Sequence, residues 1–253
     1  MGETERADFV GTERIFQADA YLSTMEATLI RIEGENGLVF DRTNFYATGG
    51  GQPGDRGFVE QSDGTKIQIV ETAYSSNARD VVMFAGESAL LPELGETLTL
   101  HIDWKRRYKL MRMHTACHLL SVVCPYPITG AAVGEEESRI DFDWPEAAAE
   151  KQAISERVME IVAANHPVFT KTITEAELEA TPGLVKSANV KPPKGTCVIR
   201  LVCIGENSSV DAQPCGGTHV SETGEVGEVH IGKIEKKGKA NRRMRIRFGP
   251  IPA

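Results

Sequence analysis

The stretch Asp103–Val123, DWKRRYKLMRMHTACHLLSVV, separates two parts of the chain that differ in character. Asp103 can cap a helix over 104–123, because Asp is a favoured residue just before a helix begins. Apolar residues recur at helical spacing and form one stripe, which consists of Met113, Ala116, Cys117, Leu120 and Val123. We therefore predict a helix with one face packed against a core.

The residues before this helix have the pattern of β-structure. Short alternating or β-rich runs are separated by turn signals such as Asp63-Gly64 and Leu94-Gly95. The predicted strands cover 27–32, 38–40, 67–70, 81–84 and 97–102. Several short strands at this spacing predict a small β-barrel, which we assign to a first domain over residues 1–100.

After the helix, further helices and strands follow without strict alternation. Asp143-Trp144-Pro145-Glu146 has the pattern of a capping box for a second helix that ends near Pro167, with an apolar face of Ile154, Val158, Ile161 and Val162. Thr174–Glu177 is a second such box and predicts a short third helix. Strands are predicted over 197–204, 228–234 and 244–248. This mixture predicts an α+β second domain over residues 101–253.

Two pairs of residues have the chemistry of a metal site. His114 and His118 are four residues apart on the predicted helix, so both rings lie on one helical face. Cys215 and His219 flank two glycines that allow a tight turn. Three nitrogens and one sulfur are ligands that zinc prefers, and we expect one Zn²⁺ per chain. Four protein ligands are typical of structural zinc, so a structural role, ligand exchange and one unused ligand all stay open.

Other zinc motifs fit less well. A metalloprotease helix has Glu directly after its first His, and here Thr115 stands in that place. The two ligand pairs are too far apart along the chain for a zinc finger. Cys117 could compete as a thiolate ligand, but it lies on the apolar stripe and is interpreted as a core residue.

Charge and glycine content suggest two further candidate surfaces. The net charge is −8, yet Lys233–Arg247 holds eight basic residues and one acid, which suits either phosphate contact or a solvated hairpin. The cluster Gly49–Gly57 contains G-x-G-x-x-G, but Phe58-Val59-Glu60 after it has the pattern of a strand, so a dinucleotide site is rejected. The loop amides either meet an anion or ribose, or form a plain turn.

The bulk composition indicates a cytoplasmic protein. There is no export signal, no apolar run long enough for a membrane helix and no phosphate-binding loop for a nucleotide triphosphate. The five cysteines are widely spaced and odd in number, so we expect reduced thiols.

Five ordered motifs carry a resemblance to a known family: NFYATGGGQPGDRG at 44–57, HTACHLL at 114–120, SRIDF at 138–142, CGGTHV at 215–220 and IEKKGKANRR at 234–243. The chain resembles the free-standing alanyl-tRNA editing proteins, the AlaX family, which are related to the editing domains of alanyl- and threonyl-tRNA synthetases. It departs from that pattern at Cys117, where threonine is usual, and at Ala47-Thr48, where Pro-Glu is commoner.

The resemblance implies an N-terminal β-barrel, an α+β editing domain and zinc bound by His114, His118, Cys215 and His219. It implies hydrolysis of tRNA(Ala) mischarged with serine or glycine, in trans because the chain has no room for an aminoacylation domain. It places Gly50, Gly51 and Gln52 near the tRNA 3′ end and Thr129 near the serine hydroxyl. We expect Arg242 and Arg243 to grip the acceptor stem. No residue stands out as a general base.

The expected partner is the acceptor end of tRNA(Ala), with no membrane and no obligatory protein partner. The main alternative is a non-catalytic, zinc-stabilised module that binds RNA. A zinc hydrolase for small esters or amides is a third reading.

Overall fold

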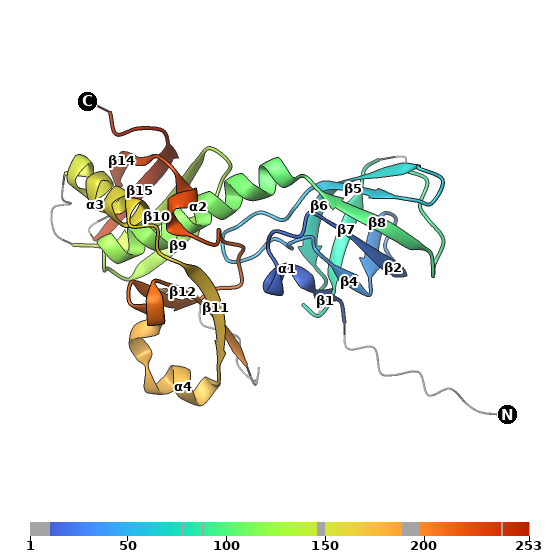
Figure 1. Ribbon diagram of the computed structural model, residues 1–253, viewed down its shortest axis with the longest axis horizontal. Coiled ribbons are helices and arrows are strands. Elements are labelled where there is room, and N and C mark those ends of the chain that lie inside the picture. Colours follow the sequence, from blue (N-terminus) through green and yellow to red (C-terminus); the bar gives the residue numbers. More distant parts are fainter. Residues whose placement is uncertain are drawn as a thin grey trace. The chain divides into compact units, whose positions relative to one another are not determined.

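The computed structural model describes residues 11–76, 78–87, 89–145, 150–188, 198–238 and 240–252 (Figure 1). It divides into two compact units. The first comprises Met1–Thr48 and Gly54–Trp104, and the second comprises Gly49–Pro53 and Lys105–Ala253. The short segment Gly49–Pro53 therefore groups with the second unit, although the chain on both sides of it belongs to the first. Three residues of the sequence patterns above lie outside the described residues: Cys197 of the strand predicted over 197–204, Lys239 of the basic segment Lys233–Arg247, and Glu146 of the capping box predicted at Asp143.

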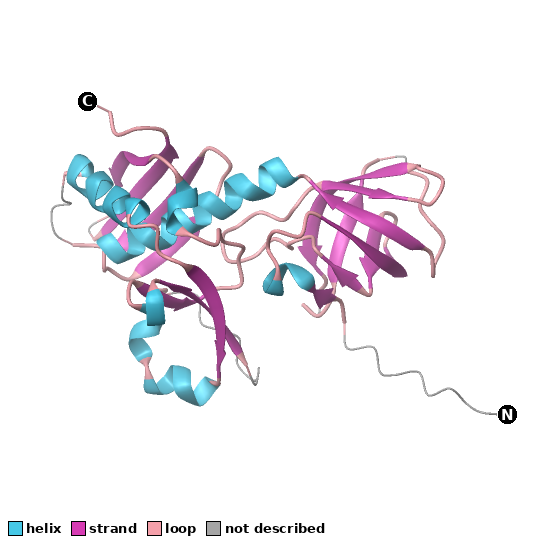
Figure 2. Cartoon of the chain, viewed as in Figure 1, coloured by secondary structure: helices cyan, strands magenta, loops and turns pink. Residues whose placement is uncertain are grey.

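The first unit is a closed six-stranded barrel, which confirms the predicted fold of this part (Figure 2). Neighbouring strands pair antiparallel in the order β2-β3-β7-β6-β5-β8. Their bounds are β2 Thr24–Glu33, β3 Gly37–Phe40, β5 Gly57–Glu60, β6 Lys66–Tyr74, β7 Val81–Ala85 and β8 Thr97–Ile102. Beside the barrel strands, β1 (Glu13–Arg14) pairs in parallel with β4 (Arg42–Thr43), and the short helix α1 covers Ile15–Ala18.

Alternation of side chains fills the barrel. In β8, Leu98, Leu100 and Ile102 are buried while Thr97 is exposed, because successive side chains of a strand point to opposite faces. The buried cluster also takes Leu29, Phe40, Val59, Ile69 and Met83 from the other strands. This unit has its own apolar core.

The second unit is built on an antiparallel sheet with the strand order β14-β15-β10-β9. Its strands are β9 Ile128–Ala132, β10 Glu137–Asp143, β14 Val229–Lys236 and β15 Asn241–Phe248. The helices α2 (Trp104–Val123) and α3 (Lys151–Ala163) cover one face of this sheet (Figure 2). The sulfur of Cys124, directly after α2, lies 3.9 Å from the Met244 sulfur, and the Ser155 hydroxyl of α3 accepts a hydrogen bond from the Ile231 amide.

The opposite face of this sheet carries charged side chains, and we call it the charged sheet face. Register places Arg139 opposite Arg245 and Asp141 opposite Arg243, so these residues share one face. The face comprises Arg139, Arg243, Arg245, Arg247 and Lys233 together with Glu137, Asp141 and Glu235. Basic side chains outnumber acidic ones here, and every arginine of the face is paired with a carboxylate.

A smaller layer completes the second unit. Strands β11 (Val168–Ile173), β12 (Ile199–Ile204) and β13 (Asp211–Pro214) form a three-stranded antiparallel sheet. The helix α4 (Glu175–Ala180) and the 3₁₀ turn η1 (Pro182–Leu184) follow β11. Leu178, Leu201 and Cys203 form its core. Two more 3₁₀ turns, η2 (Glu206–Ser208) and η3 (Thr223–Val226), lie in the connections.

The predicted helices compare unevenly with the structure. The bounds of α2 and the capping box at Thr174 and Glu177 are confirmed. The capping box at Asp143 is wrong, because Asp143 is the last residue of β10 and α3 begins only at Lys151. The apolar face of α3 is confirmed for Ile154, Val158 and Val162. No helix among the described residues is both long enough and apolar enough to cross a membrane.

Candidate metal centre

The helix α2 presents two imidazoles from inside the second unit. Its residues are buried on nearly all sides between Arg106 and Ser121, and His114 and His118 are only 5% and 6% exposed. Their spacing puts both rings on the same helical face, and the ring centroids are 5.4 Å apart. The helix thus delivers two metal-binding groups to a site that is shielded from solvent.

The loop that follows β13 supplies the other pair. Arg200 of β12 donates hydrogen bonds from Nη1 to the carbonyl oxygens of Cys215 (2.7 Å) and Gly217 (3.1 Å), which hold the loop in a tight turn. Gly217 lies directly against a ligand ring: a Cβ there would stand 2.1 Å from Cε1 of His114. Only glycine allows the loop to approach this closely.

The four side chains converge on one point, and we call them the metal cluster. Their ligand atoms in His114, His118, Cys215 and His219 all lie within 4.8 Å of one another. The Cys215 sulfur is 3.6 Å from Nε2 of His114 and 3.4 Å from Nε2 of His219. A tetrahedral zinc with ordinary bond lengths needs a sulfur–nitrogen separation of about 3.6 Å, so the donor set and its spacing fit this ion.

Each histidine of the metal cluster turns Nδ1 towards a protein oxygen. His114 Nδ1 lies 2.8 Å from Oε1 of Gln52, His118 Nδ1 lies 3.3 Å from Oδ2 of Asp211, and His219 Nδ1 lies 3.1 Å from Oγ1 of Thr115. This arrangement leaves Nε2 of each ring for the cluster. Histidines that bind metals commonly have such outer partners, which fix the ring orientation and raise the basicity of the ligand nitrogen.

Electrostatics within the cluster favour a thiolate. Burial by itself would raise the pKa of the Cys215 thiol, but His114 and His219 hold it well below its ordinary value. Burial, reinforced by the neighbouring His114, lowers the pKa of His219 to about 3, so this ring is neutral at pH 7. A thiolate and a neutral imidazole are the forms that bind zinc.

Asp211 anchors the remaining ligand through a buried polar network. Burial would raise the pKa of Asp211, yet His118 and Lys186 lower it to about 2. Burial would likewise lower the pKa of His118, whereas its contacts with Asp211 and Cys215 raise it to about 9. Lys186 Nζ (2.5 Å) and Gln213 Nε2 (2.7 Å) also donate to the Asp211 carboxylate. The negative charge is thereby compensated on several sides.

The glycine segment Gly49–Pro53 contributes directly to this site. Gly49 and Gln52 exchange two backbone hydrogen bonds, of 3.1 and 2.9 Å, and form a tight turn. Gly50 and Gly51 at its corner have φ of 56° and 83°, as a type I′ turn requires. The turn exposes both glycines and buries Gln52 against His114. The segment leads into strand β5, which agrees with the rejection of a dinucleotide fingerprint.

Comparison with known proteins identifies the family. Residues 199–245 match the family described as Threonyl and Alanyl tRNA synthetase second additional domain, and residues 13–106 match tRNA synthetases class II (A). The alanyl-tRNA editing protein AlaX-M of Methanosarcina acetivorans is 33% identical over 241 residues, which cover 92% of this chain and 97% of that protein. The chain belongs to the AlaX-M family of alanyl-tRNA editing proteins.

The same comparison relates this AlaX-M family member to larger enzymes. AlaX-M of Saccharolobus solfataricus is 31% identical over 237 residues, which cover 92% of the chain and 97% of that relative. An alanine–tRNA ligase of Pyrobaculum arsenaticum is 35% identical over 242 residues, which cover 90% of the chain but only 26% of the ligase. The similarity to the ligase thus extends over both structural units of the AlaX-M chain.

The residues expected to touch tRNA lie in different surroundings in this AlaX-M chain. Arg243 is on the charged sheet face and binds Asp141 through two hydrogen bonds, of 2.7 and 2.8 Å. Arg242 points to the other face, is 8% exposed and donates to the carbonyl oxygens of Asn241 and Pro145. The Thr129 hydroxyl donates to the Asp141 carbonyl (3.1 Å) and accepts from Asn241 Nδ2 (2.8 Å), so both partners belong to the four-stranded sheet.

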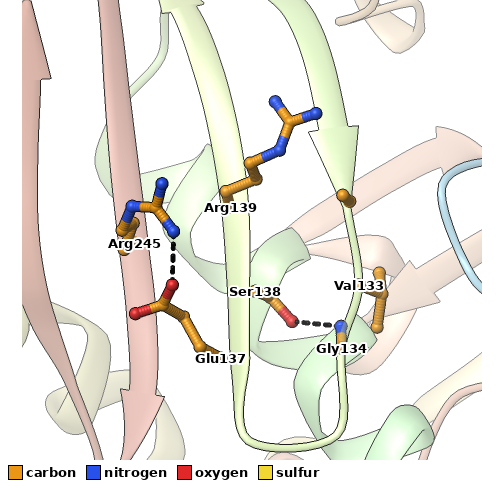
Figure 3. A pocket seen from close by; sticks show the side chains of 7 residues that line it. Val133, Gly134, Glu137, Ser138, Arg139 and Arg245 are labelled. Atoms are coloured by element: carbon orange, nitrogen blue, oxygen red, sulfur yellow. Dashed lines mark hydrogen bonds and ion pairs between the residues drawn. The ribbon is translucent and has the colours of Figure 1, made fainter.

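A cavity of about 220 Å³ lies beside the β9–β10 connection and contains none of the metal cluster residues (Figure 3). It is lined by Ala132, Val133, Gly134, Glu137, Ser138, Arg139 and Arg245. The Val133 amide donates to the Gly51 carbonyl (2.8 Å), which links this wall to the glycine turn. Because the ligand atoms converge outside this cavity, the metal cluster and not the cavity is our candidate site in the AlaX-M chain.

Sequence patterns missed the partners of the ligands. Asp211 and Lys186 belong to no recognised motif, and only the folded chain brings them to the cluster. Thr115 lies within the 114–120 motif, but its contact with His219 arises only from the fold. Cys117 is buried, and burial raises the pKa of its thiol to about 12, which agrees with a core role in this AlaX-M chain.

Proposed function

We propose that this AlaX-M family member hydrolyses the ester bond of tRNA(Ala) that carries serine or glycine, with one zinc ion in the metal cluster. The relatives' names support editing of alanyl-tRNA. The observation that carries the proposal is the convergence of three imidazole rings and one cysteine sulfur, whose ligand atoms all lie within 4.8 Å of one another. Since charged tRNA is made and used in the cytoplasm, we place the activity there.

Zinc would supply a Lewis acid that polarises the ester carbonyl or activates water. His114, His118, Cys215 and His219 would hold it. The three rings would be oriented by Gln52, Asp211 and Thr115, because each of these residues places an oxygen close to Nδ1 of one ring. Four protein ligands close a tetrahedral site, so an increase in coordination or exchange of one ligand is needed for direct chemistry.

Removal of serine but not alanine requires a group that recognises the extra hydroxyl. The small amino-acid pocket of a tRNA synthetase rejects serine poorly, whereas a second site that hydrogen-bonds the hydroxyl discriminates well. Thr129 is our proposed group. Its own proton is donated to the Asp141 carbonyl, so its hydroxyl oxygen would act towards the serine hydroxyl as an acceptor.

We propose that the tRNA end meets the glycine turn and that the acceptor stem meets the charged sheet face. Gly50 and Gly51 are exposed, and apart from the chain neighbours of Gly50 no atom of the described residues lies within 4 Å of the point where a Cβ of Gly50 would stand. Phosphates can approach such a turn closely. On the charged sheet face, Arg243 is held by Asp141 in a fixed orientation, whereas Arg242 supports the fold from the other side.

The proposal is tested by deacylation of Ser-tRNA(Ala), Gly-tRNA(Ala) and Ala-tRNA(Ala) by the purified protein. We expect fast loss of serine or glycine, with alanine spared. His114→Ala and Cys215→Ala should abolish this activity while circular dichroism shows a folded protein. If the folded, zinc-loaded wild type deacylates none of the three substrates, the non-catalytic RNA-binding reading replaces this proposal.

A further inference from the structure

Gln52 occupies an unusual place for the end of an exposed glycine turn. Gly50 and Gly51 face solvent, but Gln52 is fully buried, with an exposed fraction of 0%. A buried amide is costly unless its oxygen and nitrogen find partners. Gln52 finds them in the two segments that carry the metal ligands.

The orientation of the Gln52 amide is determined by its neighbours. The backbone amide of Thr218 can only donate, and it lies 3.1 Å from Oε1, so this atom must be the oxygen. Nε2 then donates to the Thr218 hydroxyl at 2.8 Å. Two contacts with one residue therefore hold the side-chain amide in a single orientation.

This orientation fixes the tautomer of His114. Oε1 of Gln52 lies 2.8 Å from Nδ1 of His114 and can only accept a hydrogen bond. A neutral His114 must therefore carry its proton on Nδ1. Its lone pair is then on Nε2, the atom that lies 3.6 Å from the Cys215 sulfur.

We propose that Gln52 is a positioning residue of the metal cluster: it holds His114 in the zinc-binding tautomer and fastens this ring to the Cys215–His219 loop. The inference rests on the proposed function, because it takes zinc as the ion. Outer partners of ligating histidines typically change metal affinity about 10–100-fold when they are removed. The geometry of the turn would then serve the metal as well as the tRNA end.

The test compares zinc affinity in three variants by competition with a chromophoric chelator. Gln52→Met keeps the approximate volume but removes the acceptor, and we expect zinc binding to weaken about 10–100-fold. Gln52→Glu keeps an oxygen towards His114 and should stay within about threefold of wild type. Thr218→Ser is the matched control: it removes only a methyl group and keeps the hydroxyl that accepts from Gln52, so it should also stay within about threefold.

A second readout is the visible spectrum of the Co²⁺-substituted protein, which should change in Gln52→Met and not in Thr218→Ser. Wild-type affinity in Gln52→Met, or an equal loss in Thr218→Ser, would overturn the inference. If Gln52→Met does not fold, Gln52→Asn decides, since it withdraws the oxygen from His114 while it keeps an amide. A wild type that binds no zinc would overturn the proposed function as well, whereas zinc binding unaffected by Gln52 would overturn the inference alone.

Discussion

Gly216 and Gly217 are neighbours in the metal loop, yet their surroundings differ completely. A Cβ on Gly217 would stand 2.1 Å from Cε1 and 2.4 Å from Nδ1 of His114. A Cβ on Gly216 would have nothing within 4 Å. Gly217 is therefore required by its close packing on a ligand ring. At Gly216, no steric contact among the described residues requires glycine.

Gly217→Ala should displace the His114 ring and weaken zinc binding by at least about tenfold, because ligand orientation controls metal affinity. Gly216→Ala is the matched control and should bind zinc as wild type does. Chelator competition on both purified variants measures this. Equal affinity in the two variants would show that the loop does not rest on His114 as described.

At the scale of single residues, helical geometry explains what could be predicted. His114 and His118 are brought together by local spacing, so their pairing could be read from the sequence. Gln52 and His114 are 62 positions apart, and Thr115 and His219 are 104 apart. Such contacts depend on tertiary packing, and no local pattern indicates them.

Among the elements, β15 shows how strand alternation divides a run of basic residues. Arg243 lies on the charged sheet face, while Arg242, next to it in the chain, is buried on the opposite face. The sequence predicted that these two neighbouring arginines act together, but strand alternation places their side chains on opposite faces of the sheet.

Arg243→Gln should weaken tRNA binding and reduce the slope of log K against log salt by about one, because one phosphate contact is lost. Arg242→Gln should leave this slope unchanged and lower the free energy of unfolding by about 1–3 kcal/mol, because buried hydrogen bonds to carbonyl oxygens are removed. Filter binding over a salt series and urea unfolding measure the two effects. An unchanged slope for Arg243→Gln would remove its role in RNA contact.

Helices and strands with a strong sequence periodicity were predicted correctly, whereas those with a weak one were not. The bounds of α2 agree because a long periodic segment is a strong signal. Asp143 was misassigned because its local sequence fits a helix cap equally well, whereas pairing with Asn241 makes it part of β10. Strand β11 has mostly exposed residues and so lacks the alternation that would mark it.

In the molecule as a whole, each unit has an apolar core, and the metal cluster lies entirely in the second. The sequence pattern predicted a domain boundary near residue 100, and the structure divides its two units between Trp104 and Lys105. The membership of Gly49–Pro53 in the second unit could not be predicted, because it arises from contacts of Gln52 and Gly51 with residues far along the chain.

Heating should therefore produce two unfolding transitions. Removal of zinc by a chelator should lower the midpoint temperature of only one of them. Zinc at about 100 times its dissociation constant stabilises the folded form by about 2.7 kcal/mol, which corresponds to a shift of a few degrees. Calorimetry with and without chelator measures both transitions. A single transition that shifts as a whole would show that the units unfold together.

The most direct test of the central claim is a zinc titration of the metal-free, folded protein while deacylation of Ser-tRNA(Ala) is followed. Activity should rise in proportion to added zinc, level off at one ion per chain, and fail to appear in Cys215→Ala. Full activity of the metal-free protein, or saturation at another stoichiometry, would contradict a single zinc centre that serves the editing reaction.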